Sequence, residues 1–461
     1  MSQIDKVLSR IDANINAASD RLIDWLKIPS ISTDQKYAPE IRRAAQWLVD
    51  DLKTLGIDAS IRETGGHPVV YGKTPSRPGK KRVLFYGHYD VQPVDPIDLW
   101  KNPPFEAKIG ELPDGRKAFL ARGASDDKGQ TMTFVEALRA FKEETGEFPV
   151  DVTILVEGAE EDGSKFLPEY IEKHKDDLKA DVALVCDTGR WNEDTPCINT
   201  SLRGMIYKEI IVRCANRDLH SGHYGGSAQN PIHILSRIIA DFHDKDGRVT
   251  IPGFYEGVHE TPPEILEQWK KIGMTPEDYL GPIGLKYPSG EKGRMLIELF
   301  QSRPTCDANG IIGGYTGVGT KTVIAAEASS KVSMRLVGDQ DPEKISKSFE
   351  AFVKERIPAD CSYEIINHKA SRAVSLPFDM PELEEARKAL KDEWDKDPVV
   401  IGIGGSIPVV GNFKWTLGLN TLLVGFALED DCIHSPNEKY DVKSFHKGAR
   451  SWARILANLG K

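Results

Sequence analysis

The first part of the chain alternates between helical and strand-like hydrophobic patterns. Apolar residues recur at near-helical spacing from Leu8 to Leu26 and again from about Glu40 to Leu55. Three short apolar runs are typical of buried strands: Val83–Tyr86, Val152–Val156 and Val182–Val185. Between the first two runs, Phe134, Leu138 and Phe141 share one face of a predicted helix. Strands that alternate with helices predict a largely parallel sheet with helices on both faces.

The pattern changes at about Arg203. Residues 206–213 alternate between the two faces of a strand. A helix is then expected from Pro231 to about Phe242, followed by a Pro/Gly-rich connection over 251–287. Further strand is expected at Thr322–Val337 and a second helix at Pro342–Arg356. Asp341 is the expected N-cap of the second helix. This order predicts a small α+β domain.

The α/β pattern returns after about Pro377. A helix near Glu382–Trp394, a strand at Thr421–Phe426 and a final helix from about Val442 are expected. A chain of 461 residues is also long for one compact domain. We therefore predict an α/β catalytic domain made of residues 1–202 and 378–461, interrupted by an inserted α+β domain at 203–377.

Composition and charge argue against several classes of protein. The chain is 40% apolar and 28% charged with a net charge of −10, and it has no clustered basic run, which argues against a nucleic-acid partner. No stretch of about 18 apolar residues predicts a membrane span, and the start of the chain lacks the pattern of a signal peptide. The six scattered cysteines indicate free thiols. We expect a cytoplasmic enzyme.

Polar residues with possible chemistry follow two of the predicted strands. His88 and Asp90 come directly after Val83–Tyr86, where ligands bind in open α/β sheets. Asp90 can accept a hydrogen bond from the His88 ring or hold a neighbouring group. Residues 157–164 carry four acidic side chains, Glu160 and Glu161 among them, after the second strand. Such a cluster needs a cation, raised pKa values or full solvation, so a solvated turn is the alternative.

Three further segments add to this set. Asp126 and Asp127 stand at the entrance to a predicted helix, where an acidic pair can also be a simple cap. Asp187 ends the Val182–Cys186 strand, and His434 follows the last predicted strand, where a structural histidine is the alternative.

Taken together, these residues predict a metal centre. Two imidazoles and several carboxylates without a thiolate suit a pair of Zn²⁺, Mn²⁺ or Co²⁺ ions. One carboxylate can bridge such a pair, a water can be activated between the ions, and a remaining acidic group can serve as general base. The members are His88, Asp126, Glu161, Asp187 and His434, with Glu160 beside them.

The motifs resemble the family of co-catalytic metallopeptidases that includes carnosinase, cytosolic non-specific dipeptidase, carboxypeptidase G, aminoacylase and acetylornithine deacetylase. They occur in family order over essentially the whole chain, and His88–Pro93 followed by Leu99 and Trp100 is most similar to the dipeptidase and carnosinase branch. The resemblance implies a role for each residue of the centre. Asp126 would bridge two metal ions, His88 and Asp187 would bind one, and Glu161 and His434 the other. Glu160 would be the general base on a metal-bridging water, and Asp90 would orient His88.

The inserted domain carries further similarities. His220, in 218–222, resembles the histidine that polarises the scissile carbonyl from the partner subunit of a dimer. Arg335 resembles the arginine that binds the substrate's C-terminal carboxylate, and Gly405 and Ser406 resemble a loop that contacts the same group. A surface ion pair and a simple turn are the alternatives for these two features. The resemblance implies that the domain 203–377 is a lid that also forms a homodimer.

The sequence thus predicts a metal-dependent dipeptidase. It would use two divalent ions per subunit, zinc first and manganese or cobalt as alternatives, and act on small peptides or N-acyl amino acids. A deacylase or carboxypeptidase of the same family is the nearest alternative. A catalytically inactive homologue that acts as a binding protein belongs to another class, and the intact ligand and base positions argue against it. A redox enzyme lacks a supporting nucleotide motif.

Overall fold

The computed structural model describes residues 2–404 and 407–461. The chain forms two compact units. Unit 1 comprises Met1–Thr200, Leu376–Ile401 and Ile407–Lys461, and unit 2 comprises Ser201–Ser375 and Gly402–Ser406. Gly405 and Ser406 themselves lie outside the described residues, so the structure does not test the predictions for these two positions.

The main sheet has a parallel centre. In the described residues its order is β1-β2-β6-β3-β7-β17-β8-β15, with β16 beside β8. The pairs β6–β3, β3–β7 and β7–β17 are parallel, and the strands towards both edges pair antiparallel. The bounds are β1 Asp58–Arg62, β2 Val69–Lys73, β3 Arg82–His88, β6 Asp151–Glu157, β7 Val182–Val185, β8 Cys197–Leu202, β15 Val374–Ser375, β16 Val399–Ile403 and β17 Thr421–Leu423. Strands β3, β6 and β7 are buried along their whole length, which explains their continuous apolar runs.

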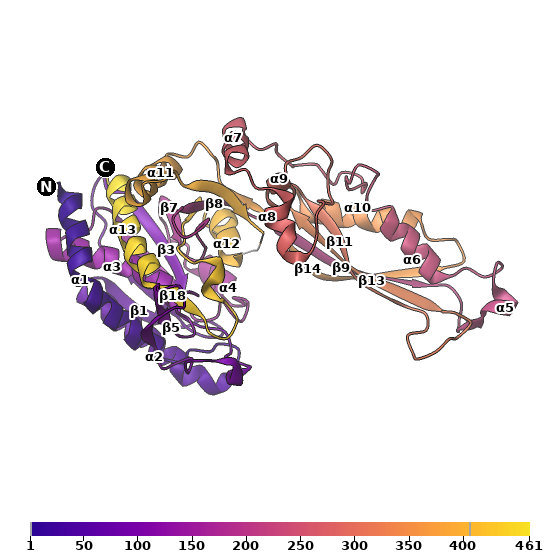
Figure 1. The fold of residues 1–461 in the computed structure, drawn as a ribbon, viewed down its shortest axis with the longest axis horizontal. Helices are drawn as coiled ribbons and strands as arrows, with labels where there is room; N and C mark the ends of the chain where they lie inside the picture. Colours follow the sequence, from indigo (N-terminus) through magenta and orange to yellow (C-terminus); the bar gives the residue numbers. More distant parts are fainter. Residues whose placement is uncertain (1, 405–406) are drawn as a thin grey trace. The chain divides into compact units, whose positions relative to one another are not determined.

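Helices cover both faces of this sheet, as predicted (Figure 1). Phe85 of β3 stacks on Phe134 of α3 with ring centroids 3.8 Å apart, and Trp452 of α13 meets both rings edge-on. The next residue, Tyr86, points to the opposite face and contacts Phe413 of α12. The helices of unit 1 are α1 Gln3–Leu26, α2 Ala38–Thr54, α3 Lys128–Thr145, α4 Leu167–Lys173, α11 Pro381–Trp394, α12 Pro408–Thr416 and α13 Val442–Leu459.

A small antiparallel sheet brings two distant motif segments together. Strands β4 (Lys108–Glu111), β5 (Lys117–Leu120) and β18 (Lys439–Asp441) lie in the order β18-β5-β4. Because Lys439 pairs with Leu120, the residues just after β5 lie beside the residues just before β18.

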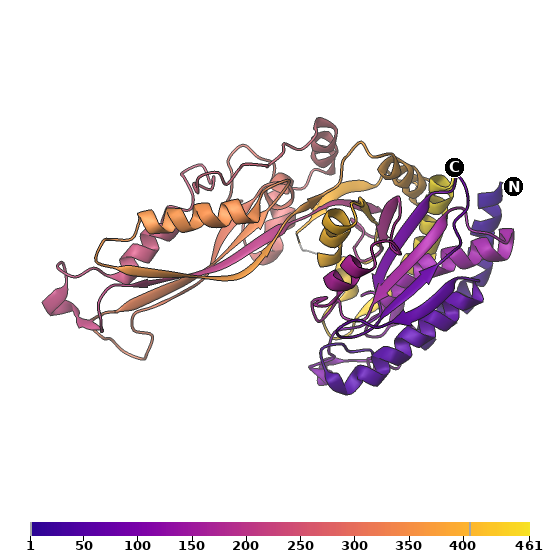
Figure 2. The ribbon, with the colours of Figure 1, turned by 180° about the vertical axis from the view of Figure 1, so that it is seen from behind.

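Unit 2 is built on a four-stranded antiparallel sheet (Figure 2). Its order is β11 (Thr305–Gly313), β13 (Glu327–Leu336), β9 (Gly204–Arg213) and β14 (Ser362–Ser371). Helices α6 (Pro231–Ala240) and α10 (Pro342–Glu355) pack on the face that carries Ile206, Ile210 and Val212. Lys208 lies on this buried face too, where its ammonium donates to Glu350 and Asn367. Asp341 caps α10, as predicted, by accepting hydrogen bonds from two backbone N–H groups.

Three predicted segments differ in detail. The 251–287 connection contains two short helices, α7 (Pro263–Ile272) and α8 (Pro276–Leu280), because its prolines and glycines begin and end helical turns. The 322–337 strand is divided into β12 (Val323–Ile324) and β13, and the predicted strand to Phe426 ends at Leu423. Further short elements of unit 2 are β10 Leu219–His220, α5 Ser221–Tyr224, the 3-10 helix Gly281–Ile283 and α9 Leu296–Gln301. Within the part of the chain that the structure describes, no helix has the length and apolar character needed to span a membrane.

Candidate metal centre

His88 is held in one orientation at the end of β3. Its side chain and that of Asp90 are buried. The ring Nδ1 lies 3.1 Å from the backbone oxygen of Asp90 and 3.5 Å from its carboxylate. A neutral ring that donates from Nδ1 to this carbonyl would carry its lone pair on Nε2, which lies 3.0 Å from Asp126 Oδ1.

The Asp90 carboxylate holds the loop that follows β6. Its two oxygens accept hydrogen bonds from the backbone N–H groups of Glu160, at 3.2 Å, and Glu161, at 3.0 Å. The sequence left open whether the Asp90 carboxylate accepts from the His88 ring or holds a neighbouring group. In the structure the carboxylate mainly holds the backbone of the neighbouring loop, and the backbone carbonyl of Asp90 makes the shorter contact with the His88 ring.

Asp126 lies between two imidazoles. Oδ1 is 3.0 Å from His88 Nε2, and Oδ2 is 3.0 Å from His434 Nε2. The simple helix cap proposed as an alternative is absent at the start of α3, because Asp127 is the N-cap residue and makes no side-chain cap hydrogen bond. The Asp127 carboxylate instead accepts hydrogen bonds from the His88 backbone N–H and the Thr131 hydroxyl. The Asp126–Asp127 peptide bond is cis.

Glu161 and His434 meet the other side of Asp126. His434 Nε2 lies 3.3 Å from Glu161 Oε2, and the same oxygen accepts a 2.6 Å hydrogen bond from Gln92 Nε2. The second carboxylate oxygen, Oε1, is buried and has no hydrogen-bond partner among the described residues. A buried carboxylate oxygen without a partner is costly unless a cation binds it.

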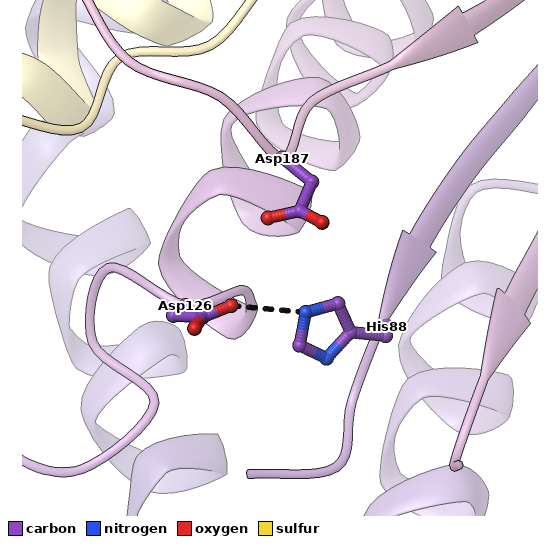
Figure 3. A group of neighbouring side chains, drawn as sticks. All are labelled: His88, Asp126 and Asp187. Carbon is purple, nitrogen blue, oxygen red and sulfur yellow. Dashed lines mark hydrogen bonds and ion pairs between the residues drawn. The ribbon is translucent and has the colours of Figure 1, made fainter. Parts of the chain in front are cut away.

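The side chains form two potential metal-binding groups that share Asp126. One contains His88, Asp126 and Asp187 (Figure 3), and the other contains Asp126, Glu161 and His434. In each group the potential ligand atoms lie within 4.8 Å of one another. All are imidazole nitrogens or carboxylate oxygens, which suits divalent ions such as Zn²⁺, Mn²⁺ and Co²⁺. Together with the unpartnered Glu161 oxygen, this donor set fits a metal pair.

Negative charge is concentrated around Glu160 and Asp187. Burial, with the nearby carboxylates of Glu161 and Asp90, raises the pKa of Glu160 to about 7. Burial and the neighbouring Asp127 raise the pKa of Asp187 well above its usual value. Divalent cations would offset this repulsion and favour the ionised carboxylates.

The two imidazoles interact strongly with Asp126. Burial alone would raise the pKa of Asp126, but its hydrogen bonds with His434 and His88 outweigh burial and lower that pKa. The hydrogen bonds with Asp126 and Glu161 raise the pKa of His434 to about 10. The side chain of His434 is 55% exposed, so this part of the centre is open to solvent.

Sequence analysis assigned no role to three residues that contact this centre. Gln92 donates to Glu161, and Arg122 and Glu438 form a buried ion pair at 2.7 Å beside the Asp126 segment. Each lies four residues from a predicted ligand in the sequence, and this proximity is the signal that could have identified them. Their partners are distant in sequence, so the motifs alone did not show what they bind.

His220 lies in the separate two-stranded β10–β12 sheet, beyond one end of β13, and Arg335 lies near the other end of that strand. His220 is exposed and pairs with Val323, before the start of β13, whereas Arg335 stands near the end of that strand. The stretch of β13 from Glu327 to Arg335 spans roughly 26 Å at about 3.3 Å per residue. Within residues 2–404 and 407–461, no hydrogen bond or ion pair engages the Arg335 guanidinium, so the structure does not show the surface ion pair considered as an alternative.

The six cysteines are free thiols, as expected. Cys186 is buried and receives a hydrogen bond from the Trp452 indole. Cys432, in contrast, is exposed in the turn that precedes His434.

Comparisons with known proteins give a consistent result. The model of peptidase family M20/M25/M40 matches residues 84–458. The chain is 32% identical over 463 residues to a Cys-Gly metallodipeptidase of Candida albicans, covering 96% of this chain and 94% of that protein. It is 27% identical over 483 residues to the Beta-Ala-His dipeptidase of Homo sapiens, covering 99% and 93%. A solved M20 family metallo-carboxypeptidase from Sulfolobus solfataricus has a TM-score of 0.77 and 32% identity, covering 95% of this chain and 98% of that one.

Proposed function

The chain belongs to peptidase family M20/M25/M40, and from this premise we propose that it is a metal-dependent dipeptidase that uses two divalent ions. The observation that carries the proposal is the pair of three-residue groups that share Asp126 in unit 1. The relatives named as Cys-Gly and Beta-Ala-His dipeptidases support dipeptides as the substrate class.

The residues assigned to the two ions follow these groups. His88 and Asp187 would hold one ion, Glu161 and His434 the other, and Asp126 would bind both. When bound, the ions supply positive charge that polarises the peptide carbonyl and makes water more acidic. Zinc is the first expectation because imidazole and carboxylate ligands suit it, and manganese and cobalt accept the same ligands.

Glu160 is the proposed general base. Its backbone N–H is held by Asp90, which places the carboxylate next to Glu161 in the loop after β6. Glu160 is not needed as a metal ligand, so its carboxylate would be available to take a proton from the attacking water and then give it to the leaving amine. Asp90 would thus position both His88 and the base.

Arg335 and His220 are proposed to contact the substrate from two subunits. Arg335 would bind the C-terminal carboxylate through its fork of N–H groups, with Gly405 and Ser406 contributing to the same site. His220 of the partner subunit would donate a hydrogen bond to the oxygen of the scissile carbonyl. The distance of roughly 26 Å along β13 supports this division, because an extended dipeptide spans only about 7 Å.

A homodimer through unit 2 is also supported by its exposed apolar residues. β11 is an edge strand, and large apolar side chains are exposed on it and in the loop that follows: Ile311, Ile312, Tyr315 and Val318. An exposed apolar group on an edge strand is typical of a protein–protein contact.

The alternatives within the family remain separable. Similarity to a solved metallo-carboxypeptidase favours release of a C-terminal residue as the second candidate, and an N-acyl amino acid deacylase would share the same centre. A dipeptidase requires a free α-amine on its substrate, whereas a deacylase requires that amine to be acylated. The cytoplasmic location stays a prediction.

The test is hydrolysis of matched substrates after metal exchange. The protein is stripped with a chelator, reconstituted with Zn²⁺, Mn²⁺ or Co²⁺, and assayed on Cys-Gly, β-Ala-His, tripeptides and N-acetylated amino acids. We expect metal-dependent cleavage of free-amine dipeptides. Cleavage confined to acylated substrates or longer peptides would contradict the dipeptidase assignment.

Two variants test the proposed base. Glu160→Gln should bind both metals and lose at least about a hundredfold in turnover, since general-base catalysis contributes on that order. Glu169→Gln, on the exposed side of α4, is the control and should keep wild-type turnover. A Glu160→Gln protein with two bound metals and wild-type turnover would refute the role of Glu160.

A further inference from the structure

Arg122 and Glu438 lie close in sequence to Asp126 and His434 in unit 1 but have no part in the scheme above. Both side chains are almost completely buried. Arg122 Nη1 donates to Glu438 Oε2 at 2.7 Å although 316 positions separate the two residues. The pairing of β18 with β5 holds their segments side by side.

Glu438 binds the backbone that carries Asp126. Its Oε2 accepts a hydrogen bond from the Gly123 N–H at 3.0 Å, in addition to the one from Arg122. Its Oε1 accepts hydrogen bonds from the Ser125 N–H at 2.9 Å and the Asp126 N–H at 3.1 Å. Four donors therefore converge on the two oxygens of one buried carboxylate.

The same ion pair reaches the segment of His88. Arg122 Nη2 donates to the backbone oxygen of Pro93 at 3.1 Å, five residues after His88. Glu438 itself follows His434 by four residues. One buried ion pair thus joins the three segments that carry His88, Asp126 and His434.

We propose that Glu438 is a positioning residue that sets Asp126 between the two metal positions and links it to His434. The proposal rests on the two-metal function above. Asp126 can contact both imidazoles only while its backbone is fixed, and Glu438 binds the N–H of that residue directly. Because Asp126 belongs to both groups, a disturbance at Glu438 acts on both metal positions, whereas a change at Glu161 acts on one.

The chemistry of the contacts makes this role specific for a carboxylate. A glutamine at position 438 keeps the shape but offers one oxygen, so its amide NH₂ would face two of the four donors. The buried Arg122 would also lose its counter-charge. An aspartate keeps the charge but is one methylene shorter, so it should restore part of the function.

The experiment measures metal binding by the apo protein, independently of turnover. Wild type, Glu438→Gln, Glu438→Asp and Glu161→Gln are stripped of metal and titrated with Zn²⁺ by calorimetry, and their Co²⁺ absorption spectra are recorded. We expect Glu438→Gln to weaken both binding steps by about 10–100-fold, the range for groups that orient metal ligands. Glu438→Asp should fall between it and wild type, and Glu161→Gln should weaken one step.

Glu393→Gln is the matched control. It removes another buried carboxylate of unit 1, which lies between Arg450 and Arg454 and contacts none of the proposed ligands. This variant should bind Zn²⁺ in two steps with wild-type affinity and show the wild-type Co²⁺ spectrum.

The outcomes separate this proposal from the one it rests on. If the wild-type protein binds fewer than two ions, the two-metal centre is refuted, and so is the positioning role of Glu438 that rests on it. If the wild-type protein binds two ions but Glu438→Gln binds them with unchanged affinity, or is weakened at only one binding step, the positioning role of Glu438 is refuted and the two-metal centre is not. If circular dichroism shows that apo Glu438→Gln is unfolded, the Glu438→Asp variant provides the test instead. Wild-type Zn²⁺ affinity of Glu438→Asp at both binding steps would then overturn the proposal.

Discussion

His220 and Arg335 of one subunit are too far apart to bind the same dipeptide. β13 alone extends roughly 26 Å from Glu327 to Arg335, and His220 lies beyond its Glu327 end, whereas an extended dipeptide spans about 7 Å. Both can act on one substrate only if they come from different subunits. We therefore predict that His220→Ala and Arg335→Ala, each nearly inactive alone, restore activity when their subunits are mixed.

The expected recovery follows from the symmetry of a dimer. In a mixed dimer, one site has both residues intact and the other site has neither. Equal amounts of the two variants with free subunit exchange give half mixed dimers, so activity should rise to roughly a quarter of the wild-type value. Arg335→Ala subunits mixed with themselves are the baseline.

A second pair of mixtures identifies which residue acts with Glu160 of its own subunit. If His220 acts from the partner subunit, Glu160→Gln should recover activity with His220→Ala and should not recover with Arg335→Ala. The assay is initial-rate hydrolysis of a free-amine dipeptide, with native mass spectrometry to count mixed dimers. Abundant mixed dimers without recovery in the His220→Ala and Arg335→Ala mixture would refute the reasoning.

Three further predictions concern stability and thiol chemistry. Backbone N–H groups at the start of α10, that of Glu343 foremost, lower the pKa of Asp341. The ionised Asp341 therefore stabilises the folded protein above the usual carboxyl pKa, and this stabilisation is lost as the pH falls through the lowered pKa. Melting curves from pH 7 to pH 3 should therefore show Asp341→Ala less stable than wild type at pH 7 and converging with it in acid. Phe134→Ala should lower the free energy of unfolding by about 3–5 kcal/mol in urea titrations, whereas the exposed Phe378→Ala should change it little. The Sγ atoms of Cys214 and Cys361 lie 3.0 Å apart, so a diazene oxidant should join them, with a mass loss of about 2 Da that Cys214→Ser abolishes.

The sequence predicted the candidate metal centre because several of its proposed ligands follow strand ends in short motifs. A parallel strand is a continuous apolar run, and the residue after it lies at the edge of the sheet where ligands bind. His88 and Asp187 could be placed in this way from β3 and β7 alone. The alternation of residues 206–213 likewise predicted β9. These features depend on local periodicity, which can be read from the sequence alone.

Other features are set by contacts between distant residues. Nothing local to the 433–438 motif shows that Glu438 binds the backbone N–H of Asp126, because 312 positions separate the two. The short helices α7 and α8 were missed for a related reason, since their prolines and glycines mark ends of helices as well as loops.

The sequence by itself determined which residue types the centre uses and the order in which the chain supplies them. Only the tertiary structure decided that each oxygen of Asp126 faces a different imidazole and that Asp90 binds the backbone beside Glu160. It alone placed His220 beyond one end of β13 and Arg335 near the other end. The physical reason is that periodicity and motifs record which face or strand end a residue occupies, whereas distances and hydrogen-bond partners are set by how separate strands and loops pack together.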